Sequence, residues 1–107
     1  MLNIVTAFDR PVPHMGQLLH ESIHVIDTIR AATPVAQGAY PLNHAVFRSA
    51  TSEDVIIFAG NDNIPVVRIR MKFDLHKRGW SATEPVENYI DQYLSEVRSQ
   101  LGDPTTH

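Results

Sequence analysis

The sequence contains no cysteine, which excludes disulfide frameworks, thiolate zinc sites and cysteine nucleophiles. It also lacks the run of roughly eighteen apolar residues that a membrane-spanning helix needs. No basic stretch followed by an apolar one opens the chain, so the sequence predicts no secretory signal. From these absences we expect a cytoplasmic protein that is not embedded in a membrane.

The residues that are present describe an ordinary globular chain. Hydrophobic residues make up 43% and charged residues 20% of the 107 positions, which suits one domain with its own core. We therefore expect a single domain spanning residues 1–107. The net charge of −3 is too small to select a partner. Its distribution is uneven, because five of the nine basic residues fall within residues 68–78, whereas the last third of the chain is acidic.

Two segments carry apolar residues at helical spacing. Residues 14–32 and 83–101 each place them on one face and polar residues on the other, so each predicts an amphipathic helix. Residues 34–41 contain two prolines and a glycine and show no period, so they predict a loop. The glycine and proline of residues 102–104 predict the end of the second helix.

Four segments predict strands. Residues 2–8 and 44–50 are short and favour β structure, and residues 55–59 begin with an apolar run typical of a central strand or one partly in an interface. Residues 65–75 alternate apolar and polar side chains, and residues 60–63 favour a hairpin before them. The resulting order, β-α-β-β-β-α, predicts an α+β fold: an antiparallel sheet with two helices packed on one face.

The same patterns predict which side chains are buried. We expect one core built from both helices and the alternating strand, with these members: Ile23, Ile26, Ile69, Met71, Phe73, Ile90 and Leu94. Trp80 is expected to cap the core. Tyr89 and Tyr93, one helical turn apart, are expected at its edge with their hydroxyl groups reaching water.

One motif in the first helix has a known chemistry. Residues 20–24 read His-Glu-Ser-Ile-His, the H-E-x-x-H pattern in which two histidines four residues apart can reach one metal ion. The stretch of residues 18–26 resembles the active-site helix of zincin metallopeptidases. The resemblance implies a zinc ion held by His20 and His24, with Glu21 as the general base acting on a zinc-bound water. A catalytic zinc needs a third protein ligand, and these residues remain candidates: Asp27, His44, Glu53, Asp54 and His76.

The sequence also departs from that family. Asp27 and Arg30 occupy the positions where metzincins carry a further glycine and histidine, and few residues precede His20 that could form a substrate-binding sheet edge. We therefore expect no metal, no cofactor and no catalytic residue, with His20 and His24 on a solvated helix face. Two alternatives stay open: a non-catalytic metal site on these histidines, and a zinc peptidase that uses Glu21.

Cations at every second position make the alternating strand a candidate binding surface. They share one face of the strand, and two more follow at its end: Arg68, Arg70, Lys72, Lys77 and Arg78. Such a stripe can attract phosphate or an acidic protein surface, or it can simply prevent strand edges from aggregating. No aromatic residue shares this face of the strand with the cations, which disfavours stacking of nucleic-acid bases.

We therefore expect a small non-enzymatic module, of the adaptor or inhibitor type, that binds another protein through this surface. Self-association is also expected, because a sheet covered on one face leaves its other face or an edge available for a homodimer. The first alternative is a zinc-dependent peptidase. The second is a nucleic-acid-binding accessory protein that uses Arg68, Arg70 and Lys72.

Overall fold

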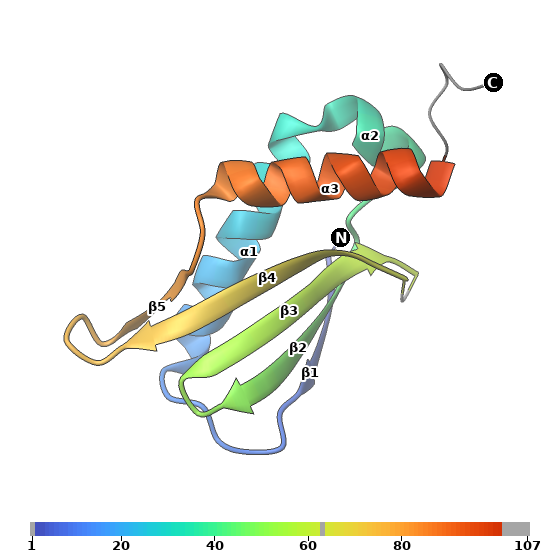
Figure 1. Cartoon of the computed structure of the whole chain (residues 1–107). Helices are drawn as coiled ribbons and strands as arrows, with labels where there is room; N and C mark the ends of the chain where they lie inside the picture. The colour runs from blue at the N-terminus through green and yellow to red at the C-terminus, as the bar shows by residue number, and fades with distance from the viewer. Residues whose placement is uncertain (1, 63, 102–107) are drawn as a thin grey trace.

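The protein is described by a computed structural model that covers residues 2–62 and 64–101 (Figure 1). Five strands and three helices follow one another along these residues: β1 (Asn3–Ala7), α1 (Met15–Ala32), α2 (Pro34–Ala39), β2 (His44–Thr51), β3 (Asp54–Asn61), β4 (Ile64–Asp74), β5 (Gly79–Ala82) and α3 (Val86–Leu101).

The strands form one sheet in the order β1-β2-β3-β4-β5, with the helices gathered on one face (Figure 1). The predicted α+β class is confirmed. The sheet is mixed, however, and not antiparallel throughout, because β1 runs parallel to β2 while the other neighbours are antiparallel. The reason is the connection: the chain crosses the sheet through α1 and α2 before β2 starts, and such a helical crossover returns it in the same direction. No helix in the described ranges is long and apolar enough to span a membrane.

Two short elements were not predicted. Residues 34–41 were expected to be a loop, yet they contain α2, which begins at Pro34 because proline fits the first turn of a helix. With six residues, α2 is too short to show a period. The second is β5, which begins at Gly79, pairs with Met71–Asp74 of β4 and was not among the four predicted strands.

The hairpin between β3 and β4 is confirmed. Gly60 is required there, because a Cβ atom at this position would lie 1.8 Å from the carbonyl oxygen of Ile64. Asp62 adopts a positive φ of 47°, a conformation that aspartate tolerates better than most residues. The predicted role of Asn63 in the turn, and the predicted helix end at Gly102, lie outside the described residues.

Burial agrees with the prediction in the strands better than in the helices. Ile26, Ile69 and Met71 are fully buried, as predicted. The other predicted core members are only partly buried. Phe73, Ile90 and Leu94 pack against the border of the core, and Ile23 is half-buried on α1. The apolar stripe of each helix is wider than the strip that contacts the sheet, so residues on the flank of the stripe stay partly exposed.

The two tyrosines of α3 correct the prediction further. Tyr89 and Tyr93 are both fully buried, where hydroxyl groups in contact with water were expected. The Tyr93 hydroxyl donates to the backbone carbonyl of Tyr40 across a distance of 2.6 Å, which fixes α3 to the chain just after α2. Trp80 is buried as expected, and its indole nitrogen donates to the carbonyl of Pro13.

Two glutamines bond to backbone groups on the β4–β5 side of the sheet. The Gln17 side chain of α1 accepts from the Trp80 N–H at 2.6 Å and donates to the Trp80 carbonyl at 3.0 Å. The Gln92 side chain of α3 accepts from the Arg68 N–H at 2.5 Å. Helix side chains therefore provide partners for three backbone groups on this side of the sheet.

Candidate binding surface on the open sheet face

The sheet face opposite the helices is not covered by any described element (Figure 1). Phe47, Ile57 and Ile69 point into the core, so the residues that alternate with them point outward. We call this surface the open face. Its members from β1 to β4 include Asn3, Val5, Ala7, His44, Val46, Arg48, Asp54, Ile56, Phe58, Arg68, Arg70 and Lys72.

The strand register fixes how these side chains lie together. Val46 pairs with Phe58, and Phe58 pairs with Arg68, so the three form a row across β2, β3 and β4. The next row joins Arg48, Ile56 and Arg70 in the same way. Each row therefore combines an apolar centre with at least one cation.

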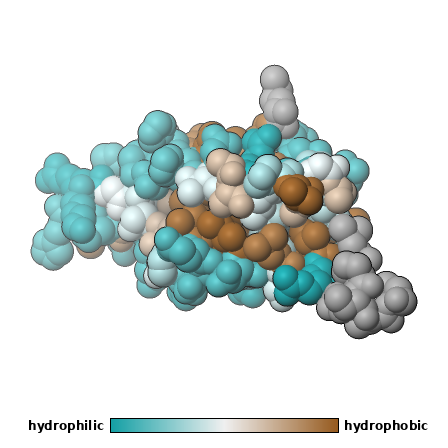
Figure 2. Space-filling view, turned by 90° about the horizontal axis from the view of Figure 1, so that it is seen from above, coloured by the Kyte–Doolittle hydropathy of each residue, from teal (hydrophilic) through white to brown (hydrophobic). Residues whose placement is uncertain are grey.

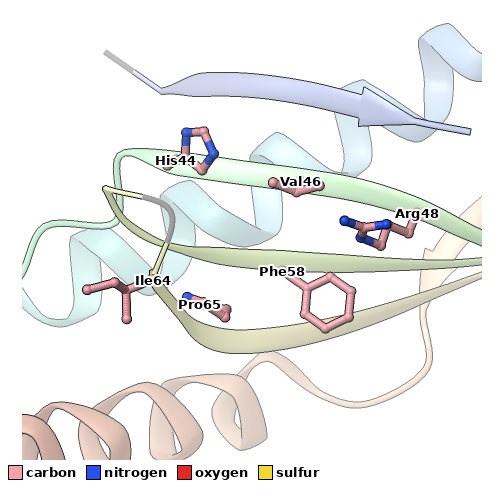
Figure 3. Close-up of a pocket in the computed structure, with 6 residues that line it drawn as sticks. All are labelled: His44, Val46, Arg48, Phe58, Ile64 and Pro65. Atoms are coloured by element: carbon pink, nitrogen blue, oxygen red, sulfur yellow. The ribbon is translucent and has the colours of Figure 1, made fainter.

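A hollow of about 250 Å³ opens in this face, and Figure 3 shows the side chains that line it. Val46 lies between His44 and Arg48 along β2 (Figure 3). The opposite wall is apolar and comes from β3 and the start of β4: Phe58, Ile64 and Pro65. The hollow thus offers space for an apolar group between a histidine and an arginine.

A second hollow, of about 290 Å³, continues this surface toward α3. Phe58 and Pro65 line both hollows, and Gln92 and Glu96 of α3 line the far side of the second. Figure 2, the view onto α3, shows apolar residues in a strip between hydrophilic margins. The apolar surface is therefore elongated and extends from the open face toward α3.

One cation of the open face is already paired. Arg70 makes a two-bond ion pair with Asp54, with Nε–Oδ1 and Nη2–Oδ2 distances of 3.0 and 2.5 Å. The Asp54 side chain is only 11% exposed. The guanidinium group of Arg70 holds the pKa of this carboxyl group below its usual range, with a further contribution from the charge of Lys72, although burial acts in the opposite direction.

The other cations have no acidic side chain within ion-pair distance among residues 2–62 and 64–101. This holds for Arg48, Arg68 and Lys72. The Arg68 guanidinium lies 6.0 Å from the centre of the Phe58 ring, within the range of a cation–π contact. The open face therefore has an excess of positive charge around an apolar centre.

The structure separates the five cations predicted to form one surface. Arg68, Arg70 and Lys72 lie together on the open face, whereas Lys77 and Arg78 lie in the turn at the tip of the β4–β5 arm (Figure 1). The Asp74 carboxylate accepts the backbone N–H groups of His76 and Lys77 in this turn, and these bonds lower the pKa of Asp74. The Asp74 side chain thus stabilises the turn through bonds to its backbone.

Sequence reasoning missed two residues of the open face. Arg48 comes from β2 and Phe58 from β3, and only the strand pairing brings them beside the β4 cations. Arg48 could have been found, because it lies at the two-residue spacing from Val46 in a predicted strand. On the open face, Phe58 of the neighbouring strand supplies the aromatic ring that this face of β4 lacks.

The H-E-x-x-H residues lie on α1, away from the open face. His20 and His24 are exposed and Glu21 is half-buried, whereas Ser22 faces the core and donates to the carbonyl of Leu18. Over the described ranges, no group of three or more His, Cys, Asp or Glu side chains is arranged to hold a metal ion. The zinc alternative therefore lacks a third ligand in this part of the chain.

Two of the candidate third ligands are engaged elsewhere. Asp27 lies 3.3 Å from Nη1 of Arg30 on the same helix, and Asp54 is held by Arg70 on the open face. The remaining candidates lie in other elements: His44 in β2, Glu53 in the β2–β3 turn and His76 in the β4–β5 turn.

Comparisons with protein-family models, with curated proteins and with solved structures find no match for the chain.

Proposed function

We propose that the protein is a non-catalytic binding module whose open face binds an acidic segment of another protein. The observation that carries this proposal is the apolar centre of the sheet, formed by Val46, Ile56 and Phe58, which no described element covers. A contiguous apolar patch with a polar rim is typical of an interaction site in a soluble domain.

The charge around the patch selects the kind of partner. Arg48, Arg68 and Lys72 have no acidic neighbour of their own within ion-pair distance in the described residues, so carboxylates of a partner can occupy the space beside them. Two copies placed face to face would instead bring like charges together, which disfavours a dimer through this surface. The elongated apolar strip suits an extended segment with one apolar side chain in the hollow lined by Val46 and Phe58.

The proposal is tested by measuring the binding of a fluorescent peptide that alternates glutamate with phenylalanine, using fluorescence anisotropy. We expect binding that weakens as the salt concentration rises. Phe58→Ala should reduce the affinity by about tenfold or more, because it removes the apolar wall of the hollow. Arg48→Glu should also weaken binding, whereas Lys77→Glu, the matched charge reversal outside the open face, should leave it unchanged.

Two results would refute the proposal. One is equal affinity for the wild type and the Phe58→Ala variant. The other is equally tight binding of a control peptide with lysine in place of glutamate, because it would show that the charge of the open face does not select the ligand.

The contact between Arg68 and Phe58 favours a second candidate function. An aromatic ring on a sheet, flanked by arginines, can stack a nucleic-acid base while the cations contact phosphates. A single-stranded oligonucleotide in the same assay separates the two candidates. If it displaces the acidic peptide and binds more tightly than the peptide does, nucleic acid replaces protein as the proposed ligand class.

A further inference from the structure

The two edges of the sheet differ in whether helix side chains bond to their backbone groups. On the β4–β5 side, Gln17 and Gln92 supply hydrogen bonds to backbone groups of Trp80 and Arg68. At the opposite edge, the backbone of β1 is hydrogen-bonded within the described residues only to β2 and to Asn43, which directly precedes it (Figure 1). An uncovered edge strand presents a row of donors and acceptors to another strand.

The backbone of β1 determines which groups are available. The Asn3 N–H donates to the Asn43 carbonyl at 2.8 Å, so this residue points its backbone groups toward β2. Backbone groups alternate in direction along a strand, so Ile4 and Thr6 direct their N–H and C=O groups to the free edge. Their edge-facing groups are two donors and two acceptors in a short, regular segment.

Natural sheets protect a free edge with charged residues, proline or a bulge. Strand β1 has none of these: its sequence is Asn-Ile-Val-Thr-Ala, and its pairing with β2 continues without a register shift. The absence of charge removes the repulsion that would oppose pairing of β1 with an identical strand.

We propose that β1 pairs antiparallel with the β1 of a second copy of this chain, about a two-fold axis at Val5. In this arrangement Ile4 lies opposite the partner's Thr6 and exchanges both backbone hydrogen bonds with it, and the two-fold axis repeats the exchange. Val5 lies opposite the partner's Val5 in a position without hydrogen bonds. This register is the one that uses all five residues of β1 while pairing the edge-facing groups of Ile4 and Thr6.

The side chains of the open face support the same register. Val5 is 42% exposed and pairs with Val46, which pairs with Phe58. Dimerisation would cover the exposed Val5 and join two such rows into one apolar row across both subunits. The inference does not depend on the proposed acidic partner, because it uses the edge of the sheet and does not involve the apolar centre formed by Val46, Ile56 and Phe58.

The absence of cysteine permits a direct test by cross-linking. The expected distance between the two Val5 Cα atoms is about 4.5 Å, which lies within the range that a disulfide spans. Val5→Cys should therefore form a disulfide-linked dimer under mild oxidation. Ala7→Cys is the matched control on the same edge and face. In the proposed register the two Ala7 positions of the dimer lie about four residues apart along the strands, which is too far for a disulfide.

Sedimentation provides the second test. The wild type should sediment as a dimer at high concentration, and Val5→Lys and Val5→Glu should each be monomeric because they place like charges opposite one another. Mixing the two variants should restore a dimer. A wild type that stays monomeric, cross-linking of Ala7→Cys as fast as that of Val5→Cys, or a mixture that remains monomeric would overturn the proposed pairing.

Discussion

The two buried tyrosines of α3 provide a matched test of how hydroxyl groups contribute to the stability of this core. Both side chains are fully buried, but only Tyr93 has a hydrogen-bond partner, the carbonyl of Tyr40 at 2.6 Å. The Tyr89 hydroxyl is the buried side-chain polar atom, within the part of the chain that the structure describes, that lacks a partner. Replacing each by phenylalanine removes one oxygen atom and leaves the ring in place.

The two substitutions should have opposite effects. Tyr93→Phe leaves the buried Tyr40 carbonyl unpaired, which costs about 1–3 kcal/mol of unfolding free energy. That loss corresponds to a decrease in Tm of roughly 4–12 °C for a domain of this size. Tyr89→Phe removes an oxygen that was desolvated without compensation, so its unfolding free energy should stay equal to the wild type or rise.

Thermal and urea unfolding followed by circular dichroism measure both variants under identical conditions. A Tyr89→Phe variant that loses as much stability as Tyr93→Phe would refute the reasoning, because it would mean that the Tyr89 hydroxyl is bonded in the folded protein. Equal stability of Tyr93→Phe and the wild type would show that the bond from Tyr93 to the Tyr40 carbonyl does not stabilise the fold.

The pH dependence gives an independent check on Tyr93. Burial raises the pKa of its hydroxyl group, so the folded state favours the neutral form. Stability is then fully present below the pKa of an unfolded tyrosine, about 10, and is lost as the pH rises from there through the folded-state pKa. Tyr93→Phe should reduce this alkaline loss of stability.

Three further predictions concern other parts of the fold. Gly60→Ala should strongly destabilise the protein in urea unfolding, because its Cβ atom would clash with the backbone of Ile64. Gly16→Ala in α1 has open space and should stabilise the fold by about 0.5–1 kcal/mol. Similar effects of the two substitutions would contradict the hairpin geometry. The ion pair of Asp54 lowers the pKa of its carboxyl group, so this group should contribute stability that is present above a pH of about 4 and is lost as the pH falls through the folded-state pKa. An Asp54→Asn variant with the same acid unfolding midpoint as the wild type would argue against this contribution. Ile57→Ala should cost about 2–5 kcal/mol of unfolding free energy, and Ile56→Ala much less, since only Ile57 is fully buried. Equal costs would contradict the assigned facing of β3.

The sequence predicted the long elements because each has a period that only one structure satisfies. The helix expected over residues 14–32 is Met15–Ala32, and the alternation of residues 65–75 is strand Ile64–Asp74. The short elements α2 and β5 escaped prediction, because six and four residues are too few to show a period. The parallel pairing of β1 depends on a contact across forty residues, which local patterns do not encode.

The candidate site was predictable only where it lies on one strand. Arg68, Arg70 and Lys72 share a face of β4, and their two-residue spacing shows this directly. Arg48 and Phe58 join them through strand pairing, which depends on turn geometry and register. In α3, sequence predicted an apolar stripe but not which flank of it would contact the sheet, so Tyr89 and Tyr93 were assigned to the edge.

The parallel pairing of β1 with β2 also has a consequence for the order of folding. Strands β2, β3 and β4 are joined by tight turns, so their contacts are local and close small loops. The contact between Asn3 and His44 instead closes a loop that contains all of α1 and α2, and closing this longer loop costs more chain entropy. We expect the three-stranded meander to form first and β1 to add late, so that native-state hydrogen exchange finds β1 amides opening at lower free energy than those of β3. Until β1 is in place, the edge of β2 is the one exposed to other chains, and crowded refolding should favour wrong pairing there.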